Sequence, residues 1–182
     1  MIVKDEANSI QQTIQSVLGI VDRYCILDTG SSDNTIELIK SSFGSTPGIV
    51  YSEPFIDFAT TRNRVLELAG KECAFTLMLS GDEYLRNGEK YPLFHLYNKI
   101  SFIHTLLYYL KHIKTKPGGI ELKVHYGQTS YNSIRVCNTL YNWTYFGVTH
   151  EYVTSLTPKT ITYQMPYTNE KDVYILHDLS NL

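Results

Sequence analysis

Apolar residues recur in two alternating patterns along the first half of the chain. Helical spacing of these residues predicts helices within residues 10–21, 34–43 and 57–69. Short apolar runs of strand length occur at residues 24–27, 48–51 and 74–79. Ile2 and Val3 indicate the end of one further strand. Because strands that alternate with helices of roughly ten residues form parallel sheets covered on both faces, we predict an α/β fold.

Polar residues at the expected starts support the first two of these helices. Ser9 and Gln12 have the spacing of a capping box, and Asn34 with Glu37 suits the start of the second helix. The third helix is expected to run over residues 57–69. Its expected inward-facing residues are Phe58, Val65, Leu66 and Ala69.

The second half of the chain is less regular. Apolar residues at helical spacing predict a helix over 103–113, and the KPGG sequence at 116–119 breaks the pattern. Apolar and polar residues then alternate over 120–126, as in a strand buried on one face. Shorter strand patterns follow at 133–137, 161–165 and 173–176.

Length and composition fit one globular domain. A chain of 182 residues is most simply a single domain, and we expect it to span 1–182 with a parallel half over 1–89 and a more antiparallel half over 90–182. The formal net charge of −2 provides no basic face for nucleic acid. Three cysteines far apart in the sequence fit a reducing compartment. No signal peptide is visible, and no segment has the roughly 18 apolar residues of a membrane span, so we expect a cytoplasmic protein.

The stretch that points most directly to chemistry is FTLMLSGDE at 75–83. An apolar run of strand length ends there on small residues, followed by Asp82 and Glu83. In open α/β sheets, ligands bind beyond the carboxyl ends of the strands. A carboxylate at this place can hold Mg²⁺ or Mn²⁺ and, through the cation, a diphosphate. Two other interpretations stay open for this acidic pair: a helix N-terminus and a surface turn.

Asp28 ends another predicted strand and precedes small turn residues at 29–32. We favour a binding role toward a nucleoside, because its side chain is not needed to cap the helix that starts several residues later. Asp33 and Asn34 are more simply explained as helix caps. Arg62 lies within the third predicted helix, where its guanidinium suits phosphate binding and a solvated surface position equally well.

Two residues late in the chain are further candidates. Glu151 follows a glycine-containing turn and has the chemistry of a general base, although the polar alternation around it favours an ordinary strand. His177 follows the last apolar run and is by default a strand-end histidine, but its imidazole would suit a divalent cation. The single tryptophan, Trp143, fits core packing better than sugar stacking.

Five short phrases occur in order along the chain: MIVKDE at 1–6, LDTGSSDNT at 27–35, TRN at 61–63, LSGDE at 79–83 and VTHEYV at 148–153. Their order and rough spacing resemble family 2 glycosyltransferases of the GT-A fold. The most similar subgroup carries MIVKNE, VDTGSTDGT, ARN, LDADE and VHEYL in the same order. Each phrase by itself is weak, and the resemblance rests on their order over residues 1–178.

The resemblance implies a Rossmann-like GT-A domain with a mostly parallel central sheet, a nucleotide-binding half over 1–89 and an acceptor-side half over 90–182. It implies an inverting enzyme that uses Mn²⁺ or Mg²⁺ to transfer a sugar from a nucleotide-diphosphate donor to a glycan, lipid or protein acceptor. Glu151 would be the catalytic base, and Asp82 and His177 would bind the metal. The donor would contact Val3, Asp5, Glu6, Asp28, Arg62, Ser80 and Gly81.

Two positions depart from the family pattern. Ser80 stands where the family carries the first acid of its DxD motif, which removes one negative charge from the expected cation site. Asp5 replaces an asparagine, a smaller change. The serine keeps a second function open, that of a nucleotide-sugar or glycan binding module with weakened or absent catalysis. A nucleotidyltransferase ranks last, because the chain has no Gly-rich, Lys-bearing loop for a triphosphate.

Overall fold

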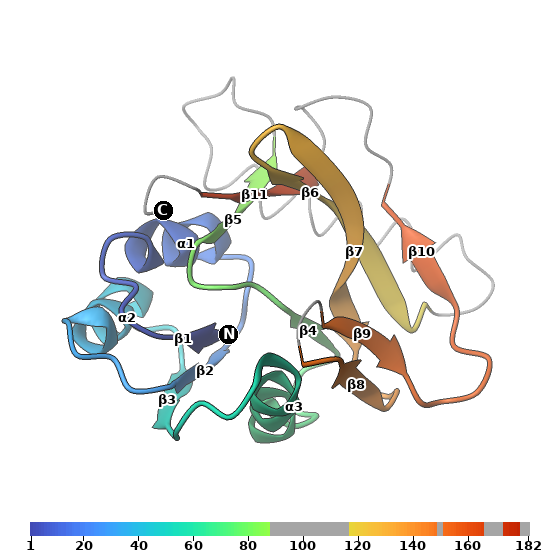
Figure 1. Cartoon of the computed structure of the whole chain (residues 1–182), viewed down its shortest axis with the longest axis horizontal. Coiled ribbons are helices and arrows are strands. Elements are labelled where there is room, and N and C mark those ends of the chain that lie inside the picture. Colours follow the sequence, from blue (N-terminus) through green and yellow to red (C-terminus); the bar gives the residue numbers. More distant parts are fainter. Residues whose placement is uncertain (88–116, 149–150, 166–172, 179–182) are drawn as a thin grey trace.

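The N-terminal part of the chain forms a small parallel sheet with helices packed against it (Figure 1). The computed structural model describes residues 1–87, 117–148, 151–165 and 173–178, so the helix predicted over 103–113 lies outside these residues. The strands are ordered β1-β2-β3. The elements are β1 (Ile2–Val3), α1 (Ile10–Val17), β2 (Tyr24–Asp28), α2 (Thr35–Phe43), β3 (Gly48–Ser52) and α3 (Phe58–Ala69).

Strand β2 is the centre of this part because both of its faces are covered. Ile26 packs with Ile14 of α1 and Ile39 of α2, and all three side chains are fully buried. Its neighbour Leu27 points the other way and packs with Val65 of α3. Successive strand residues face opposite sides of a sheet, so two adjacent apolar residues anchor helices on both faces. The predicted helix–strand alternation over the first 69 residues is confirmed.

The second part of the fold is a six-stranded mixed sheet in the order β4-β7-β6-β11-β5, with β10 paired to β6. Its strands are β4 (Phe75–Leu77), β5 (Glu83–Asn87), β6 (Gly119–Tyr126), β7 (Thr129–Asn138), β10 (Thr162–Gln164) and β11 (Val173–His177). A separate antiparallel hairpin is formed by β8 (Trp143–Phe146) and β9 (Tyr152–Ser155).

The expectation of a mostly parallel central sheet is wrong for this part of the chain. Strand β6 is parallel to β10 and β11, whereas β6–β7, β4–β7 and β5–β11 are antiparallel. The physical reason is the connection between β6 and β7. Tyr126 pairs with Thr129, so the loop is too short for anything except a hairpin, and Gly127 supplies the positive φ of 56° that such a turn needs. The protein is therefore α/β with one parallel and one mixed sheet.

Three local predictions have mixed outcomes. The alternation over 120–126 is confirmed, since Ile120, Leu122 and Val124 are buried. The third helix, expected over 57–69, is formed by Phe58–Ala69, and Asp57 caps it by accepting a 2.8 Å hydrogen bond from the amide of Thr60. The inward position predicted for Phe58 is wrong: the residue is 45% exposed, because Ala59 and Thr61 occupy the buried face in the first turn of α3.

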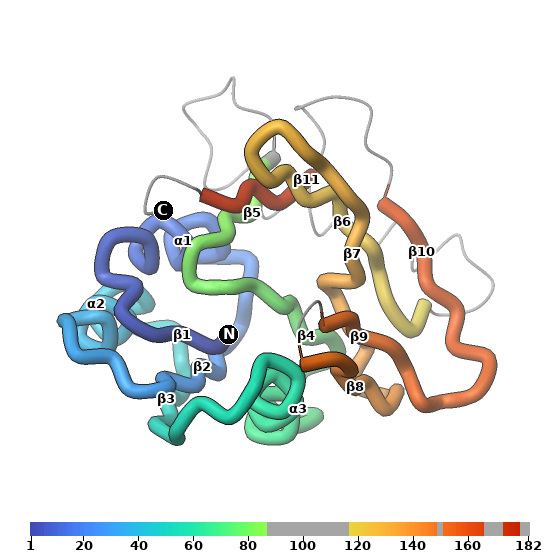
Figure 2. The backbone as a smooth tube through the Cα atoms, in the orientation of Figure 1, coloured from blue at the N-terminus to red at the C-terminus, as the bar shows by residue number. Residues whose placement is uncertain are grey.

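The two sheets share a core through α1 and the chain that follows β4. Val17 of α1 packs with Leu122 and Ile175 of the mixed sheet, while Ile14 on the same helix packs into the parallel sheet. The green segment in Figure 2, residues 78–82, carries the chain from β4 to β5 beside this helix. Among the described residues, no helix is both long enough and apolar enough to cross a membrane.

Ile14→Ala should lower the free energy of unfolding by about 2–5 kcal/mol, because it removes a fully buried side chain. Ile56→Ala is a matched control, since Ile56 is 70% exposed and its truncation should cost less than about 0.5 kcal/mol. Urea unfolding followed by circular dichroism measures both variants. Equal losses would contradict the packing described here.

Candidate functional site

Arg62 on α3 connects two of the predicted site residues. Its Nε donates to Glu151 Oε1 at 2.9 Å, and its Nη2 donates to Ser80 Oγ at 3.2 Å. The side chains of Arg62 and Glu151 are only 12% and 19% exposed, so the ion pair is screened less by water than a surface pair. The guanidinium also lies 5.6 Å from the centroid of the Tyr145 ring. Three distant segments therefore meet at one guanidinium.

Asp82 and His177 form a second contact of predicted site residues. His177 Nε2 lies 2.9 Å from Asp82 Oδ2, and Nδ1 on the other side of the ring lies 3.8 Å from Glu83 Oε1. The ring of Tyr126 stands edge-on to the imidazole with centroids 4.8 Å apart. The amide of Asp178 donates to the carbonyl of Asp82 at 2.9 Å. The end of β11 is thereby attached to the turn before β5, with its imidazole between two carboxylates.

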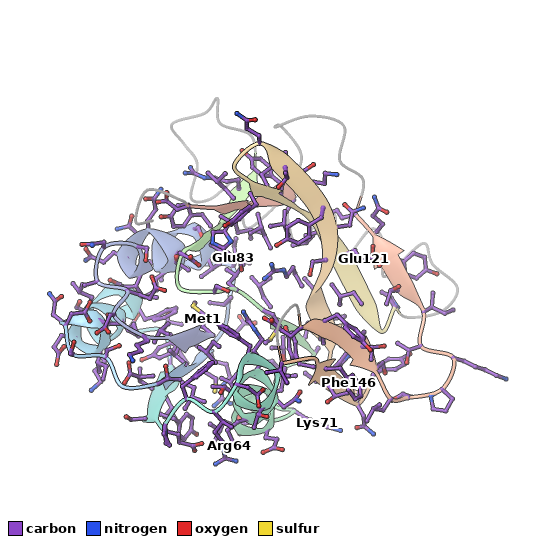
Figure 3. The ribbon with its side chains drawn as sticks, viewed as in Figure 1. Met1, Arg64, Lys71, Glu83, Glu121 and Phe146 are labelled. Atoms are coloured by element: carbon purple, nitrogen blue, oxygen red, sulfur yellow. The ribbon has the colours of Figure 1, made fainter. Side chains whose placement is uncertain are left out.

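Glu83 and Arg135 form a buried, two-point ion pair next to these contacts. Arg135 Nη1 and Nη2 each lie 2.7 Å from a different oxygen of Glu83. The residues are 2% and 9% exposed. Burial alone would raise the pKa of Glu83, but the guanidinium and a hydrogen bond from the Ser80 amide outweigh it, and the pKa lies below its usual value. Glu83 is labelled in Figure 3 on the segment that leads into β5.

The N-terminal phrases form one hydrogen-bonded turn region. Asp5 has a φ of +53°, a left-handed conformation that aspartate tolerates better than most residues. Its amide donates to Ser31 Oγ at 2.9 Å, and its Oδ1 accepts from the amide of Ser32 at 2.7 Å. Asp28 is 1% exposed and accepts from the Gly30 amide at 3.1 Å and from Ser31 Oγ at 2.5 Å. The Asp28 carboxylate therefore shapes the turn between β2 and α2.

Glu6 lies against the turn that carries Gly81. A Cβ atom on Gly81 would come 2.8 Å from Glu6 Cγ, so only glycine allows this close approach. Ser9 Oγ donates to Glu6 Oε2 at 2.6 Å, which replaces the predicted capping box with Gln12. Burial raises the pKa of Glu6 above its usual value, and the nearby Asp82 acts in the same direction. The first and fourth sequence phrases are therefore neighbours in space.

The predicted site residues differ in how they are placed. Direct side-chain contacts join Arg62 with Ser80 and Glu151, and Asp82 with His177. The Asp28 carboxylate is directed into its own turn, so its acceptor positions are already partly used. Val3 is 3% exposed and packs into the core, and its carbonyl accepts from the Thr29 amide at 2.9 Å. Any contact of Val3 with a ligand would have to come from its backbone.

Two residues that complete this arrangement were missing from the sequence prediction. Arg135 neutralises Glu83, and the signal for it was an arginine inside the apolar strand at 133–137, where a charge needs a buried partner. Asn63 is the second: its Oδ1 accepts from the Tyr145 amide at 2.7 Å and its Nδ2 donates to the Tyr145 carbonyl at 2.9 Å. Asn63 thereby holds β8 against α3, beside Arg62.

The donor atoms of Asp82 and His177 fit a divalent cation. A carboxylate oxygen and an imidazole nitrogen are both ligands for Mn²⁺, and the oxygen suits Mg²⁺. Within the part of the chain that the structure describes, no group of three or more His, Cys, Asp or Glu residues is placed to hold a metal ion. Two protein ligands suit a cation that completes its coordination with phosphate oxygens and water.

A cavity of about 290 Å³ lies away from these polar contacts. Apolar side chains line most of it, including Val17, Phe75 and Leu77, and none of the predicted site residues does so. Its lining comes from β2, α1 and α3 as well as from β4 and the residues that follow it. Because this lining is mostly apolar, we place the candidate site at the turn of residues 80–83.

Comparison with protein-family models found no match to this chain, and no curated protein matched it. The functional interpretation therefore depends on the residues and on their geometry.

Glu83→Gln should lower the free energy of unfolding by about 3–5 kcal/mol at neutral pH, because the Arg135 guanidinium would stay buried without its counter-charge. The pKa of Glu83 is lower in the folded than in the unfolded chain. The contribution of Glu83 is therefore fully present above the unfolded value of about 4.5 and is lost as the pH falls through the folded value. The variant should accordingly lose less stability on acidification than the wild-type chain.

Urea unfolding at a series of pH values measures this difference. Glu67→Gln is the control, because the Glu67 side chain is 70% exposed. Parallel stability curves for the wild-type chain and Glu83→Gln would show that Glu83 does not carry the acid dependence.

Proposed function

We propose that this chain is an inverting glycosyltransferase of the GT-A type that uses a nucleotide-diphosphate sugar. The observation that carries the proposal is the convergence of Arg62, Ser80 and Glu151 next to the Asp82–His177 pair. A carboxylate that can act as a base, a cation-binding pair and a guanidinium are the groups that a reaction of a sugar diphosphate needs. The five-phrase resemblance in the sequence supports the same class.

On the donor side, the diphosphate would lie between Arg62 and the Asp82–His177 pair. A guanidinium has more N–H donors than the two that contact Glu151 and Ser80, so Arg62 can also bind phosphate oxygens. The turn region around Asp5 and residues 29–32 would face the nucleoside, with backbone groups and hydroxyls as its partners. Gly81 lets the backbone of this turn approach the side chain of Glu6 closely.

A divalent cation bound by Asp82 and His177 would supply positive charge to the departing diphosphate. Arg62 would do the same from the other side of the turn, where negative charge grows as the sugar–oxygen bond breaks. The Asp178 amide holds the backbone carbonyl of Asp82, and the two carboxylates around the His177 ring orient the imidazole.

Glu151 would take the proton of the acceptor hydroxyl. The acceptor oxygen then forms its bond to the anomeric carbon while the bond from that carbon to the diphosphate breaks, and the nucleoside diphosphate leaves with the electron pair. Arg62 holds Glu151 Oε1 at 2.9 Å and thereby orients the carboxylate. Attack from the face opposite the leaving group inverts the configuration. Proton removal of this kind typically contributes ~10²–10⁴-fold to the rate.

On the acceptor side, two exposed aromatic rings stand beside Glu151. Phe146, labelled in Figure 3 on the β8–β9 hairpin, is 43% exposed, and Tyr152 is 61% exposed. Their centroids are 6.0 Å apart with an interplanar angle of 30°. Rings of this kind supply an apolar surface next to a polar group, which suits the C–H face of an acceptor sugar.

Ser80 favours a second function, a nucleotide-sugar or glycan binding module. Its hydroxyl accepts a hydrogen bond from Arg62 but supplies no negative charge to a cation. A module of this kind would bind nucleotide-sugar without dependence on Mn²⁺ and would show neither hydrolysis nor transfer. Binding that is unaffected by removal of the cation distinguishes it from the enzyme.

The first experiment is a thermal-shift screen of nucleoside-diphosphate sugars with different bases, each with and without MnCl₂. A ligand that binds only the folded chain raises the melting temperature. We expect one base to stabilise the chain and the shift to require the cation. Glu151→Gln should then keep nucleotide binding and lose ~10²–10⁴-fold in cation-dependent hydrolysis or transfer.

Glu53→Gln is the matched control, because Glu53 also pairs with an arginine on α3, namely Arg64, but on an exposed surface. It should behave as the wild-type chain does. Full turnover by Glu151→Gln would remove Glu151 as the base, and turnover lost equally in both variants would point to a general effect on α3.

Ser80→Asp should raise the affinity for Mn²⁺ by about tenfold, because it adds a carboxylate to the turn that carries Asp82. The MnCl₂ concentration for half-maximal donor hydrolysis and the loss of the free Mn²⁺ signal in electron paramagnetic resonance both measure it. Ser41→Asp, on the exposed side of α2, is the control. Unchanged Mn²⁺ affinity in Ser80→Asp would argue against a cation at this turn.

A further inference from the structure

We infer that Arg135 and Glu83 are positioning residues: as a buried pair they hold the turn of residues 80–83 so that Ser80 faces Arg62 and Asp82 faces His177. This inference rests on the proposed function, because it names the residues that hold in place the side chains proposed to bind the cation and the diphosphate. Neither residue is proposed to touch the substrate.

The first argument is the connectivity of the Glu83 carboxylate. Oε2 accepts from Arg135 Nη1 at 2.7 Å and from the Ser80 amide at 2.9 Å. Oε1 accepts from Arg135 Nη2 at 2.7 Å and lies 3.8 Å from His177 Nδ1. One carboxylate therefore reaches both halves of the site: the backbone of Ser80 on one side and the imidazole of His177 on the other.

The second argument concerns Arg135, which belongs to a different strand of the mixed sheet from Glu83. It lies on β7, and its Nη1 is also 3.5 Å from the carbonyl of Met78, just after β4. The Met78 amide in turn donates to the Arg135 carbonyl at 2.8 Å. Arg135 thus contacts the chain where it leaves β4, and its ion pair with Glu83 fixes the chain where it enters β5. The intervening turn is held at both ends by one side chain.

The third argument is that the pair is poorly suited to stability alone. Two charges buried together are often no more stabilising than apolar residues of the same volume. Arg135 Nε is also buried with no hydrogen-bond partner among the described residues. A pair selected only for stability would be expected to satisfy this donor. Fixing the position of a polar turn is a role that an apolar pair could not perform.

The test compares a double variant, Glu83→Leu with Arg135→Met, against Arg135→Lys and the wild-type chain. The double variant replaces the pair by apolar side chains and should fold with a melting temperature near that of the wild-type chain. Arg135→Lys keeps the charge but loses the two-point geometry. Arg64→Lys is the control, because Arg64 makes a similar but exposed pair with Glu53 on the outer side of α3 (Figure 3).

Two readouts separate positioning from folding. The first is hydrogen exchange of the Asp178 amide in the absence of metal, which reports on its bond to the Asp82 carbonyl and involves neither deleted side chain. We expect exchange about tenfold faster in the double variant. The second is the affinity for MnCl₂ alone, followed by the free Mn²⁺ signal, which should fall by about tenfold or more in both Arg135 variants.

The outcomes distinguish this inference from the proposed function. A double variant that folds and keeps both wild-type Asp178 exchange and wild-type Mn²⁺ affinity would overturn the inference. Failure of both Arg135 variants to fold would also overturn it, because the pair would then be a requirement of the fold. If the wild-type chain does not bind Mn²⁺, the proposed cation site fails, and Asp178 exchange alone decides whether Arg135 and Glu83 position the turn.

Discussion

The buried ion pair between Glu83 and Arg135 is the constraint on which the candidate site depends. Removing two charges from water is costly, and the cost is offset only when the geometry is good and other hydrogen bonds are made. Here two 2.7 Å contacts and the Ser80 amide meet that condition for the Glu83 carboxylate, whereas Arg135 Nε has no hydrogen-bond partner among the described residues. These contacts restrict the conformation of the turn at 80–83. The side chains of Arg62 and His177 both contact this turn, the first at Ser80 and the second at Asp82.

The balance of charge around this turn gives the site its chemical character. The carboxylates are those of Glu6, Asp82, Glu83 and Glu151, and the guanidiniums are those of Arg62 and Arg135. Carboxylates outnumber guanidiniums, and the raised pKa of Glu6 reflects both its burial and the negative charge of Asp82. The proposed divalent cation would relieve this excess. The serine at position 80 keeps the excess smaller, which fits a cation that arrives together with phosphate.

Much of the local structure could be predicted from the sequence, because its causes are local. The stripe on α1 and the alternation over 120–126 depend only on the spacing of apolar residues along the chain. Asp82 was predicted as a site residue for a similar reason, because an apolar run that ends on small residues can be recognised in the sequence. Phe58 was misplaced because the spacing of apolar residues did not distinguish it from its neighbour Ala59, which is the residue that faces the core in the structure.

The sequence by itself determined the helices and strands of the first half, the acidic turn at 80–83 and the residue types available for chemistry. Only the tertiary structure decided their partners. Arg62 meets Glu151 across 89 positions and Arg135 meets Glu83 across 52. For the second pair, the antiparallel pairing of β4 with β7 places Arg135 beside the chain that leaves β4. Local spacing carries no information about such pairs, because a buried charge selects its partner from whatever the closed fold brings within reach.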